Sequence, residues 1–219
     1  MRLDMYLVET GHFSTRTKAK KAIKDGFVRL DGLIVSKPSK RVNNADKIVV
    51  ESGHDKPKGY FKLSYIQSHT NVLRSNDHVL DIGSSAGGFL LFSSEIVDHV
   101  QGIEYSLSFK EELDELVSIY DNISVIYGDI FSIHLTEFGD KKFDVILNDL
   151  TLDPQDSVTA LSRVIPMLRE NGRLIQVLKT ETFNEIEPIS EKLQELGFRI
   201  KKKIGSTKKE IYLYCVLDA

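Results

Sequence analysis

The chain has 219 residues, 41% of them hydrophobic, which is enough for one large domain or a large domain with a small one. No apolar run approaches the ~20 residues of a membrane span, and we do not expect the residues after Met1 to form a secretory signal. One cysteine, Cys215, excludes an internal disulfide and gives no cysteine-rich metal site, so we expect a cytoplasmic protein without a metal. Because Cys215 lies in an apolar run, we expect it to be a buried packing residue.

The net charge of −3 is unevenly distributed along the chain. Residues 1–50 carry eleven Lys and Arg against five Asp and Glu, whereas the rest carries 18 against 27. A basic segment ahead of an acidic body favours contact of that segment with a polyanion. Charge alone leaves nucleic acid, an anionic membrane and a merely solvated face as alternatives.

The first 50 residues have the pattern of a small α+β module. Apolar side chains on one face of residues 2–8 predict a short helix, and a basic helix is predicted over residues 16–24, with Ser14 or Thr15 as its N-cap. Short strands are predicted at residues 27–30, 33–35 and 47–50, and an Asp-Gly pair between the first two indicates a hairpin.

This order of helix, basic helix, glycine stop and hairpin resembles the S4 domain, a small RNA-binding module. The resemblance covers nearly all of residues 1–50 and implies that basic side chains contact RNA phosphates, which position the RNA without reading its sequence. The RNA-binding residues predicted on this basis are Arg2, Arg16, Lys18, Lys20, Lys21, Lys24 and Arg29.

A polar segment at residues 51–59 predicts a linker to a second domain at residues 60–219, and its His54 is expected to be a solvent-exposed loop residue. Alternating apolar runs and amphipathic stretches in the second domain predict a doubly wound α/β fold with a mostly parallel sheet. A turn at residues 205–208 should join the last two strands as an antiparallel hairpin. The predicted strands are residues 78–82, 100–104, 124–127, 143–149, 173–178, 198–203 and 211–217, and the predicted helices are 61–70, 87–96, 108–120, 155–169 and 184–196.

Residues 79–89 are the most informative segment. A short apolar run ends in Asp81, a glycine-rich loop follows, and an amphipathic stretch then begins. The G-x-x-x-G-G spacing is neither that of dinucleotide enzymes nor that of a P-loop. The segment resembles motif I of S-adenosylmethionine-dependent methyltransferases; a loop that serves only helix–strand packing is the alternative.

This resemblance implies that S-adenosylmethionine binds at the carboxyl ends of the first three strands. Asp81 would orient the loop or reach the cofactor's amino group through water. Glu104 ends the second strand and could accept both ribose hydroxyls, and Asp129 follows the third and could accept the adenine amino group. The predicted cofactor-binding residues are Asp81, Gly83, Ser84, Ser85, Gly87, Gly88, Phe89, Glu104 and Asp129.

Four charged residues stand where strands begin or end, or just before the first strand. Lys62 precedes the first strand, Asp149 and Lys179 end the fourth and fifth, and Glu210 begins the last. Their order resembles the Lys-Asp-Lys-Glu catalytic tetrad of FtsJ-like RNA 2′-O-methyltransferases; two ordinary salt bridges are the alternative. The resemblance makes Lys179, oriented by Asp149, the residue that contacts the 2′-OH, with Lys62 and Glu210 positioning the ribose and its phosphate.

A lysine can activate a 2′-OH only if its pKa falls well below the usual ~10.4. Burial and a second lysine lower such a pKa, whereas acids oppose the change. We therefore expect the pKa of Lys179 to be depressed.

An S4 module followed by an FtsJ-like domain resembles the TlyA (hemolysin A) family of ribosomal RNA 2′-O-methyltransferases over essentially the whole chain. The resemblance implies methyl transfer to ribosomal RNA, free or within a subunit. The chain departs from the family pattern after Phe89 and after Lys179.

Three other functions were weighed against this one. A non-catalytic RNA-binding or ribosome-assembly factor could keep the fold. A membrane-active hemolysin has no amphipathic or spanning segment in its favour. A base methyltransferase would carry an Asn/Asp-Pro-Pro-aromatic motif, which residues 148–154 lack.

Overall fold

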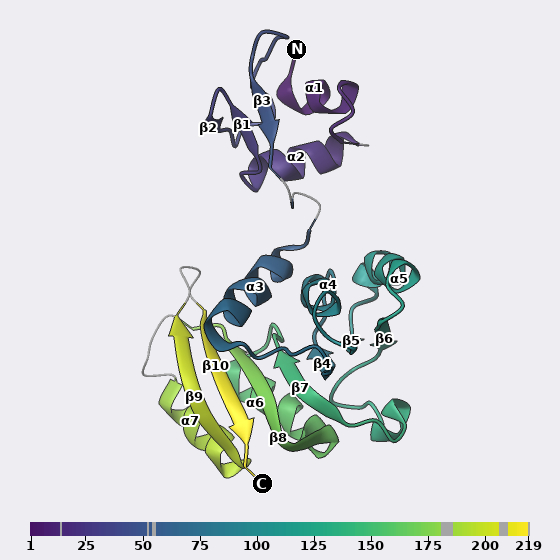
Figure 1. The fold of residues 1–219 in the computed structure, drawn as a ribbon, viewed down its shortest axis with the longest axis vertical. Coiled ribbons are helices and arrows are strands. Elements are labelled where there is room, and N and C mark those ends of the chain that lie inside the picture. The colour runs from purple at the N-terminus through teal and green to yellow at the C-terminus, as the bar shows by residue number, and fades with distance from the viewer. Residues whose placement is uncertain (14, 52, 54–55, 181–185, 206–209, 219) are drawn as a thin grey trace. The chain divides into compact units, whose positions relative to one another are not determined.

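The structure is a computed structural model that describes residues 1–219 except 14, 52, 54–55, 181–185, 206–209 and 219. It divides into two compact units, Met1–Lys56 and Pro57–Ala219, each with its own core (Figure 1). The predictions for Ser14 and His54, for most of the turn at 205–208 and for the start of the helix at 184–196 lie outside the described residues.

The first unit packs two helices against a small antiparallel sheet of order β2-β1-β3. The Thr15 hydroxyl accepts a hydrogen bond from the Lys18 N–H and so caps the second helix. The elements are α1 (Leu3–Glu9), α2 (Arg16–Lys24), β1 (Val28–Leu30), β2 (Leu33–Ile34) and β3 (Ile48–Val50). Their core contains Leu3, Leu7, Ala19, Ala22, Ile23 and Val28.

The second unit is built on a seven-stranded sheet of order β6-β5-β4-β7-β8-β10-β9, parallel except for β10, which pairs antiparallel with both neighbours. The predicted doubly wound fold with its terminal hairpin is confirmed. The strands are β4 (His78–Ile82), β5 (His99–Glu104), β6 (Ile123–Tyr127), β7 (Phe143–Asn148), β8 (Leu168–Leu178), β9 (Phe198–Gly205) and β10 (Ile211–Leu217).

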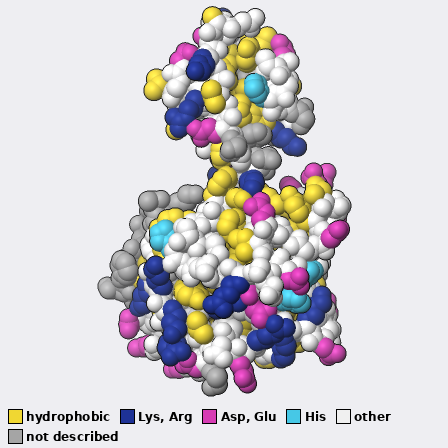
Figure 2. All heavy atoms as spheres, viewed as in Figure 1, with side chains coloured by type: hydrophobic (Ala, Val, Ile, Leu, Met, Phe, Trp, Pro, Cys, Tyr) yellow, Lys and Arg dark blue, Asp and Glu magenta, His cyan; other side chains and the backbone are white. Residues whose placement is uncertain are grey.

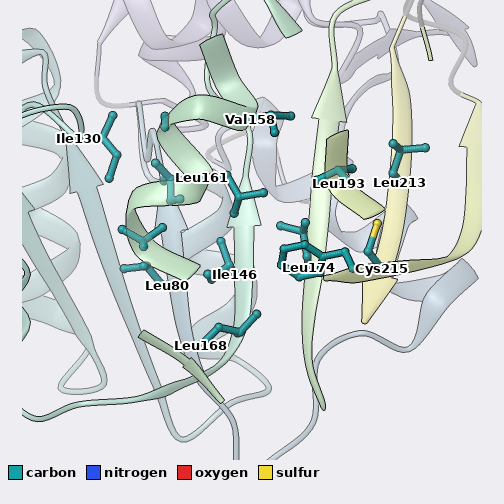
Figure 3. Close-up of a cluster of buried hydrophobic side chains, with 14 of the residues drawn as sticks. Leu80, Ile130, Ile146, Val158, Leu161, Leu168, Leu174, Leu193, Leu213 and Cys215 are labelled. Carbon is teal, nitrogen blue, oxygen red and sulfur yellow. The ribbon is translucent and has the colours of Figure 1, made fainter. Parts of the chain in front are cut away.

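Helices cover both faces of this sheet, so each face has a core of its own (Figure 1). One face is covered by α3 (Lys58–Thr70), α4 (Gly88–Ser94) and α5 (Lys110–Ile119), the other by α6 (Pro154–Val164) and α7 (Ile186–Glu195). Figure 3 shows the second core, in which residues of β4, β7, β8 and β10 meet α6 and α7. Short 3₁₀ turns lie at Leu107–Phe109, Leu135–Phe138 and Ile165–Met167.

Several predicted boundaries differ from those of the structure by one or more residues, and two of the differences concern the ends of helices. The helix expected at 155–169 ends at Val164, and β8 already begins at Leu168, because Pro166 lacks the N–H that would continue the helix. The linker expected at 51–59 is shorter, because Lys58 and Gly59 lie in α3.

Candidate active site

Four charged side chains meet at the carboxyl edge of the large sheet. The Lys62 Nζ lies 2.7 Å from Oδ2 of Asp149 and 3.1 Å from Oε1 of Glu210. The Lys179 Nζ lies 2.5 Å from Oδ1 of Asp149 and 3.0 Å from the same oxygen of Glu210. Each lysine therefore bridges both acids, and the four residues form a closed ring of alternating charge.

Sheet topology explains this convergence. Strands β7 and β8 are parallel, so Asp149 and Lys179, which directly follow them, lie at one edge. Strand β10 runs the opposite way, and its Ile211 pairs with Leu178 of β8. The register therefore places Glu210, one residue before β10, beside Lys179.

The charges of the ring decide its protonation. Burial alone would lower the pKa of Lys179, but the neighbouring Asp149 and Glu210 outweigh burial and raise that pKa. Burial would raise the pKa of Glu210, but Lys179 and Lys62 outweigh it and lower that pKa. The expected depression of the Lys179 pKa is therefore wrong, because two carboxylates contact its ammonium group.

Tyr212 is a part of the site that the sequence did not single out. Its hydroxyl donates to Oε2 of Glu210 at 3.0 Å, which fixes that carboxylate from the side opposite the lysines. The signal was present, because side chains two residues apart on a strand lie on the same face.

A buried polar network lies next to Asp149. The Asn148 amide donates to Oε1 of Gln176 at 2.8 Å and to the carbonyl oxygen of Ser157 at 3.0 Å. All three residues are buried, and together they tie the end of β7 to β8 and to the first turns of α6. The network holds the backbone from which Asp149 projects.

Two glycines bring α3 against α4 and so set the position of Lys62. A Cβ on Gly88 would lie 2.6 Å from the Tyr60 nitrogen and 2.7 Å from the Gly59 Cα, which are backbone atoms. The residue after Gly88 is Phe89, whose ring centroid lies 6.0 Å from the Lys62 Nζ. Close backbone approach at these glycines therefore positions the helix that carries Lys62.

The glycine-rich loop owes much of its composition to packing. Gly83 and Gly87 have positive φ, and a Cβ on Gly87 would lie 2.2 Å from the Leu116 side chain. Ser84 and Phe89, predicted to bind the cofactor, are each 4% exposed. The exposed Ser85 donates its backbone N–H to Glu104.

The three acids predicted at strand ends differ in their surroundings. Asp81 is fully buried, neither carboxyl oxygen has a hydrogen-bond partner among the described residues, and burial raises its pKa to about 8. Glu104 accepts the N–H groups of Ser85 at 2.7 Å and Ser106 at 2.6 Å, which leaves a second lone pair on each oxygen. Asp129 accepts the N–H of Phe131 at 3.0 Å through Oδ1.

The arginines predicted to bind RNA are paired with acids in the first unit. Asp4 is fully buried and accepts from Nε of Arg2 and from Nε of Arg16, each at 2.9 Å. These arginines lower the pKa of Asp4 to about 2. Arg29 likewise lies 2.5 Å from Glu51.

The lysines of α2, unlike these arginines, are not paired with acids among the described residues. Among the described residues, no acid lies within ion-pair distance of them, and most are exposed. They are Lys18, Lys20, Lys21 and Lys24. Their ammonium groups are thus more available to a ligand than the guanidinium groups of the paired arginines.

Other chemistry has little basis in the described part of the chain. Cys215 is buried in β10, as predicted, and burial raises the pKa of its thiol to about 12, which makes it inert as a nucleophile. Among the described residues, no group of three His, Cys, Asp or Glu side chains could hold a metal ion, and none of their helices is long and apolar enough to cross a membrane.

The fold and site define an S-adenosylmethionine-dependent methyltransferase: a glycine-rich loop follows the first strand, and the sheet ends in an antiparallel hairpin. The edge fits that cofactor, since Asp81 is an orphaned buried polar group and Glu104 keeps free acceptor capacity. The chain belongs to the FtsJ-like methyltransferase family, whose model matches residues 56–216, and an S4 domain matches residues 1–53.

Known proteins agree with this assignment. The chain is 30% identical to the "Ribosomal RNA large subunit methyltransferase E" of Wigglesworthia glossinidia brevipalpis over 78% of its length and 91% of the relative's. A structure named as a hemolysin of Streptococcus thermophilus has a similar fold over 100% of this chain and 88% of its own, with a TM-score of 0.63 at 17% identity. The structure of Aeropyrum pernix fibrillarin with S-adenosylmethionine bound has a TM-score of 0.62 at 19% identity. The match covers 82% of this chain and 85% of the fibrillarin chain.

Proposed function

We propose that the chain is an RNA ribose 2′-O-methyltransferase that acts on ribosomal RNA in the cytoplasm. The observation that carries the proposal is the ring of Lys62, Asp149, Lys179 and Glu210, whose two ammonium and two carboxylate groups meet at one edge of the sheet. Support for the substrate comes from a basic S4 domain and from relatives named for ribosomal RNA methylation.

The charged state of the ring shapes the proposed chemistry. The cofactor, when bound, supplies an electrophilic methyl group. Lys179 is the most exposed member, at 27%, and its raised pKa means that it carries its proton before RNA arrives. It would donate a hydrogen bond to the 2′ oxygen as that oxygen gains negative charge, while Asp149 orients it and accepts the hydroxyl proton.

Lys62 and Glu210 have positioning roles in this proposal. Lys62 is held on both sides by Asp149 and Glu210 and is 17% exposed, so it would contact the ribose or its phosphate in exchange for one of its two hydrogen bonds to Asp149. Near the ring, Asp81, Gly83, Ser85, Glu104 and Asp129 would hold the cofactor, and the lysines of α2 would bind phosphates elsewhere on the RNA.

Transfer of labelled methyl groups from S-adenosylmethionine to total RNA and to ribosomal subunits tests the proposal. We expect label on ribosomal RNA with the wild-type chain and a loss of more than about a hundredfold with Lys179→Ala. Cofactor affinity of the variant, measured alongside, should equal that of the wild type. Absence of transfer to any RNA, together with absence of cofactor binding, would favour a non-catalytic RNA-binding factor.

A further inference from the structure

An exposed aromatic pair lies on α3 one turn beyond Lys62. Tyr65 is 42% exposed, and its ring centroid is 4.3 Å from that of His69 and 6.4 Å from that of Tyr212. Because Tyr212 donates to Glu210, the aromatic pair adjoins the catalytic ring. An exposed tyrosine three residues from Lys62 shares a side of the helix with that lysine.

Strand β9, at the edge of the sheet, supplies positive charge beside this pair. Lys201, Lys202 and Lys203 are all exposed, and among the described residues no acid forms an ion pair with them. The Lys202 Nζ donates to the carbonyl oxygen of His69 at 2.8 Å, which holds it at the end of α3. Figure 2 shows Lys and Arg side chains gathered over β9.

Aromatic and basic groups in this combination match a single strand of RNA. Bases stack on exposed aromatic rings whatever their identity, while lysines contact the phosphates between them. The charge is also unusual for its setting, since residues 51–219 carry 18 basic side chains against 27 acidic ones. After its bond to His69, Lys202 still has two N–H donors for a phosphate.

We propose that Tyr65, His69 and Lys202 bind the RNA strand that adjoins the target nucleotide, with Tyr65 stacked on a base and Lys202 on a phosphate. This inference rests on the proposed function, because it takes the catalytic ring as the place where the target ribose lies. These residues belong to the second unit, whereas the lysines of α2 belong to the first. We therefore expect Tyr65, His69 and Lys202 to position the RNA at the ring, and the lysines of α2 to contribute affinity for RNA in general.

Strand β9 itself contains a control. Lysines on an edge strand also discourage pairing with other sheets, and any of the three would serve that purpose equally. A role in RNA binding, in contrast, requires a lysine on the face of the sheet that α3 covers. Lys202 pairs with Tyr214, which packs in the core beneath α3, whereas Lys203 pairs with Leu213, which packs in the core beneath α6 and α7. The two lysines therefore point to opposite faces of the sheet.

The first test compares Tyr65→Ala with Tyr65→Phe in the full chain, by steady-state methylation of deproteinised large-subunit ribosomal RNA. We expect Tyr65→Ala to raise the KM for RNA about tenfold, with the cofactor Kd unchanged, because a stacked base is lost. Tyr65→Phe keeps the ring and should keep the wild-type KM. An unchanged KM in Tyr65→Ala would overturn the inference.

The second test compares Lys202→Gln with Lys203→Gln in the same assay at several salt concentrations. We expect Lys202→Gln to raise the KM and to reduce the slope of log KM against log salt by about one, and Lys203→Gln to change neither. Equal effects of the two variants would overturn the inference while leaving the proposed function intact. A wild-type chain that binds cofactor but methylates no RNA would overturn both.

Discussion

At the scale of single residues, the proposed catalytic ring of Lys62, Asp149, Lys179 and Glu210 contains two positive and two negative charges. The sequence was sufficient to single out these residues, because Asp149, Lys179 and Glu210 adjoin recognisable strands and the order of the four, with Lys62 first, resembles that of the FtsJ-like tetrad. It was not sufficient to predict their protonation, because the pKa of Lys179 depends on two carboxylates at 2.5 and 3.0 Å that come from distant parts of the chain.

The protonation of the ring predicts a pH profile. The raised pKa of Lys179 and the lowered pKa of Glu210 move both titrations away from neutral pH. We therefore expect kcat/KM for RNA to be nearly constant between about pH 6 and pH 7, below the pKa of about 8 of Asp81. A tenfold rise of kcat/KM per pH unit across this range would show that a deprotonated lysine is the active form, contrary to the proposed role.

The buried Asp81 predicts a dependence of stability on pH. Its pKa is about 8 in the folded chain, against about 4 in an unfolded one, so it retains a proton on folding. Between about pH 4 and pH 8, Asp81 is protonated in the folded state but ionised in the unfolded state. The free energy of unfolding therefore falls as the pH rises through this range. Asp81→Asn should remove this contribution and be more stable than the wild type at about pH 8.

Urea unfolding of Asp81→Asn and the wild type at about pH 5 and about pH 8 measures this effect. The stability gain of the variant should be larger at the higher pH, by an amount that reflects the titration of one group. An equal difference at both pH values would show that Asp81 is ionised in the folded chain.

At the scale of elements, the parallel strands were predictable because strands buried on both faces read as apolar runs. Strands β4 and β10 match their predicted residues, 78–82 and 211–217. Contacts between elements were not predictable in this way. The close approach of Gly59 and Gly88 joins helices separated by a strand and a loop, and no local pattern identifies it.

The contact between α3 and α4 predicts that one added methyl group at Gly88 destabilises the protein. Gly88→Ala places a Cβ against backbone atoms of α3, which cannot move aside as a side chain would. We expect a loss of about 1–3 kcal/mol in the free energy of unfolding and a lower kcat, because Lys62 moves with α3. Gly128→Ala is the matched control for stability, since its Cβ would meet only Ile133, at 3.8 Å. Equal stabilities of the two variants would contradict this account.

At the scale of the whole molecule, a basic unit precedes an acidic catalytic one, and the sequence indicated this division by its charge asymmetry, by the pattern of residues 1–50 and by a polar segment after them. It could not separate structural from available cations in the first unit. Arg2 and Arg16 enclose the buried Asp4, a contact between residues up to twelve positions apart that depends on how α1 and α2 pack.

Substitutions should separate these two groups. Replacing Lys18, Lys20, Lys21 and Lys24 by Gln should weaken RNA binding and its salt dependence while leaving stability and cofactor affinity unchanged. Arg16→Ala should chiefly destabilise the first unit, because it leaves Asp4 buried with one partner fewer. Thermal unfolding and RNA titration of both variants measure this. A stable Arg16→Ala with RNA affinity as low as that of the lysine variant would place Arg16 among the RNA ligands instead.

The measurement that tests the central claim most directly is the chemical position of the transferred methyl group. Ribosomal RNA methylated by the wild-type chain can be digested to nucleosides and analysed by mass spectrometry, with Lys179→Ala as the control. The proposed function predicts the methyl group on the ribose of a 2′-O-methylnucleoside, absent with the variant. A methyl group on a base, or equal modification by Lys179→Ala, would contradict the assignment of the ring as a 2′-O-methyltransferase site.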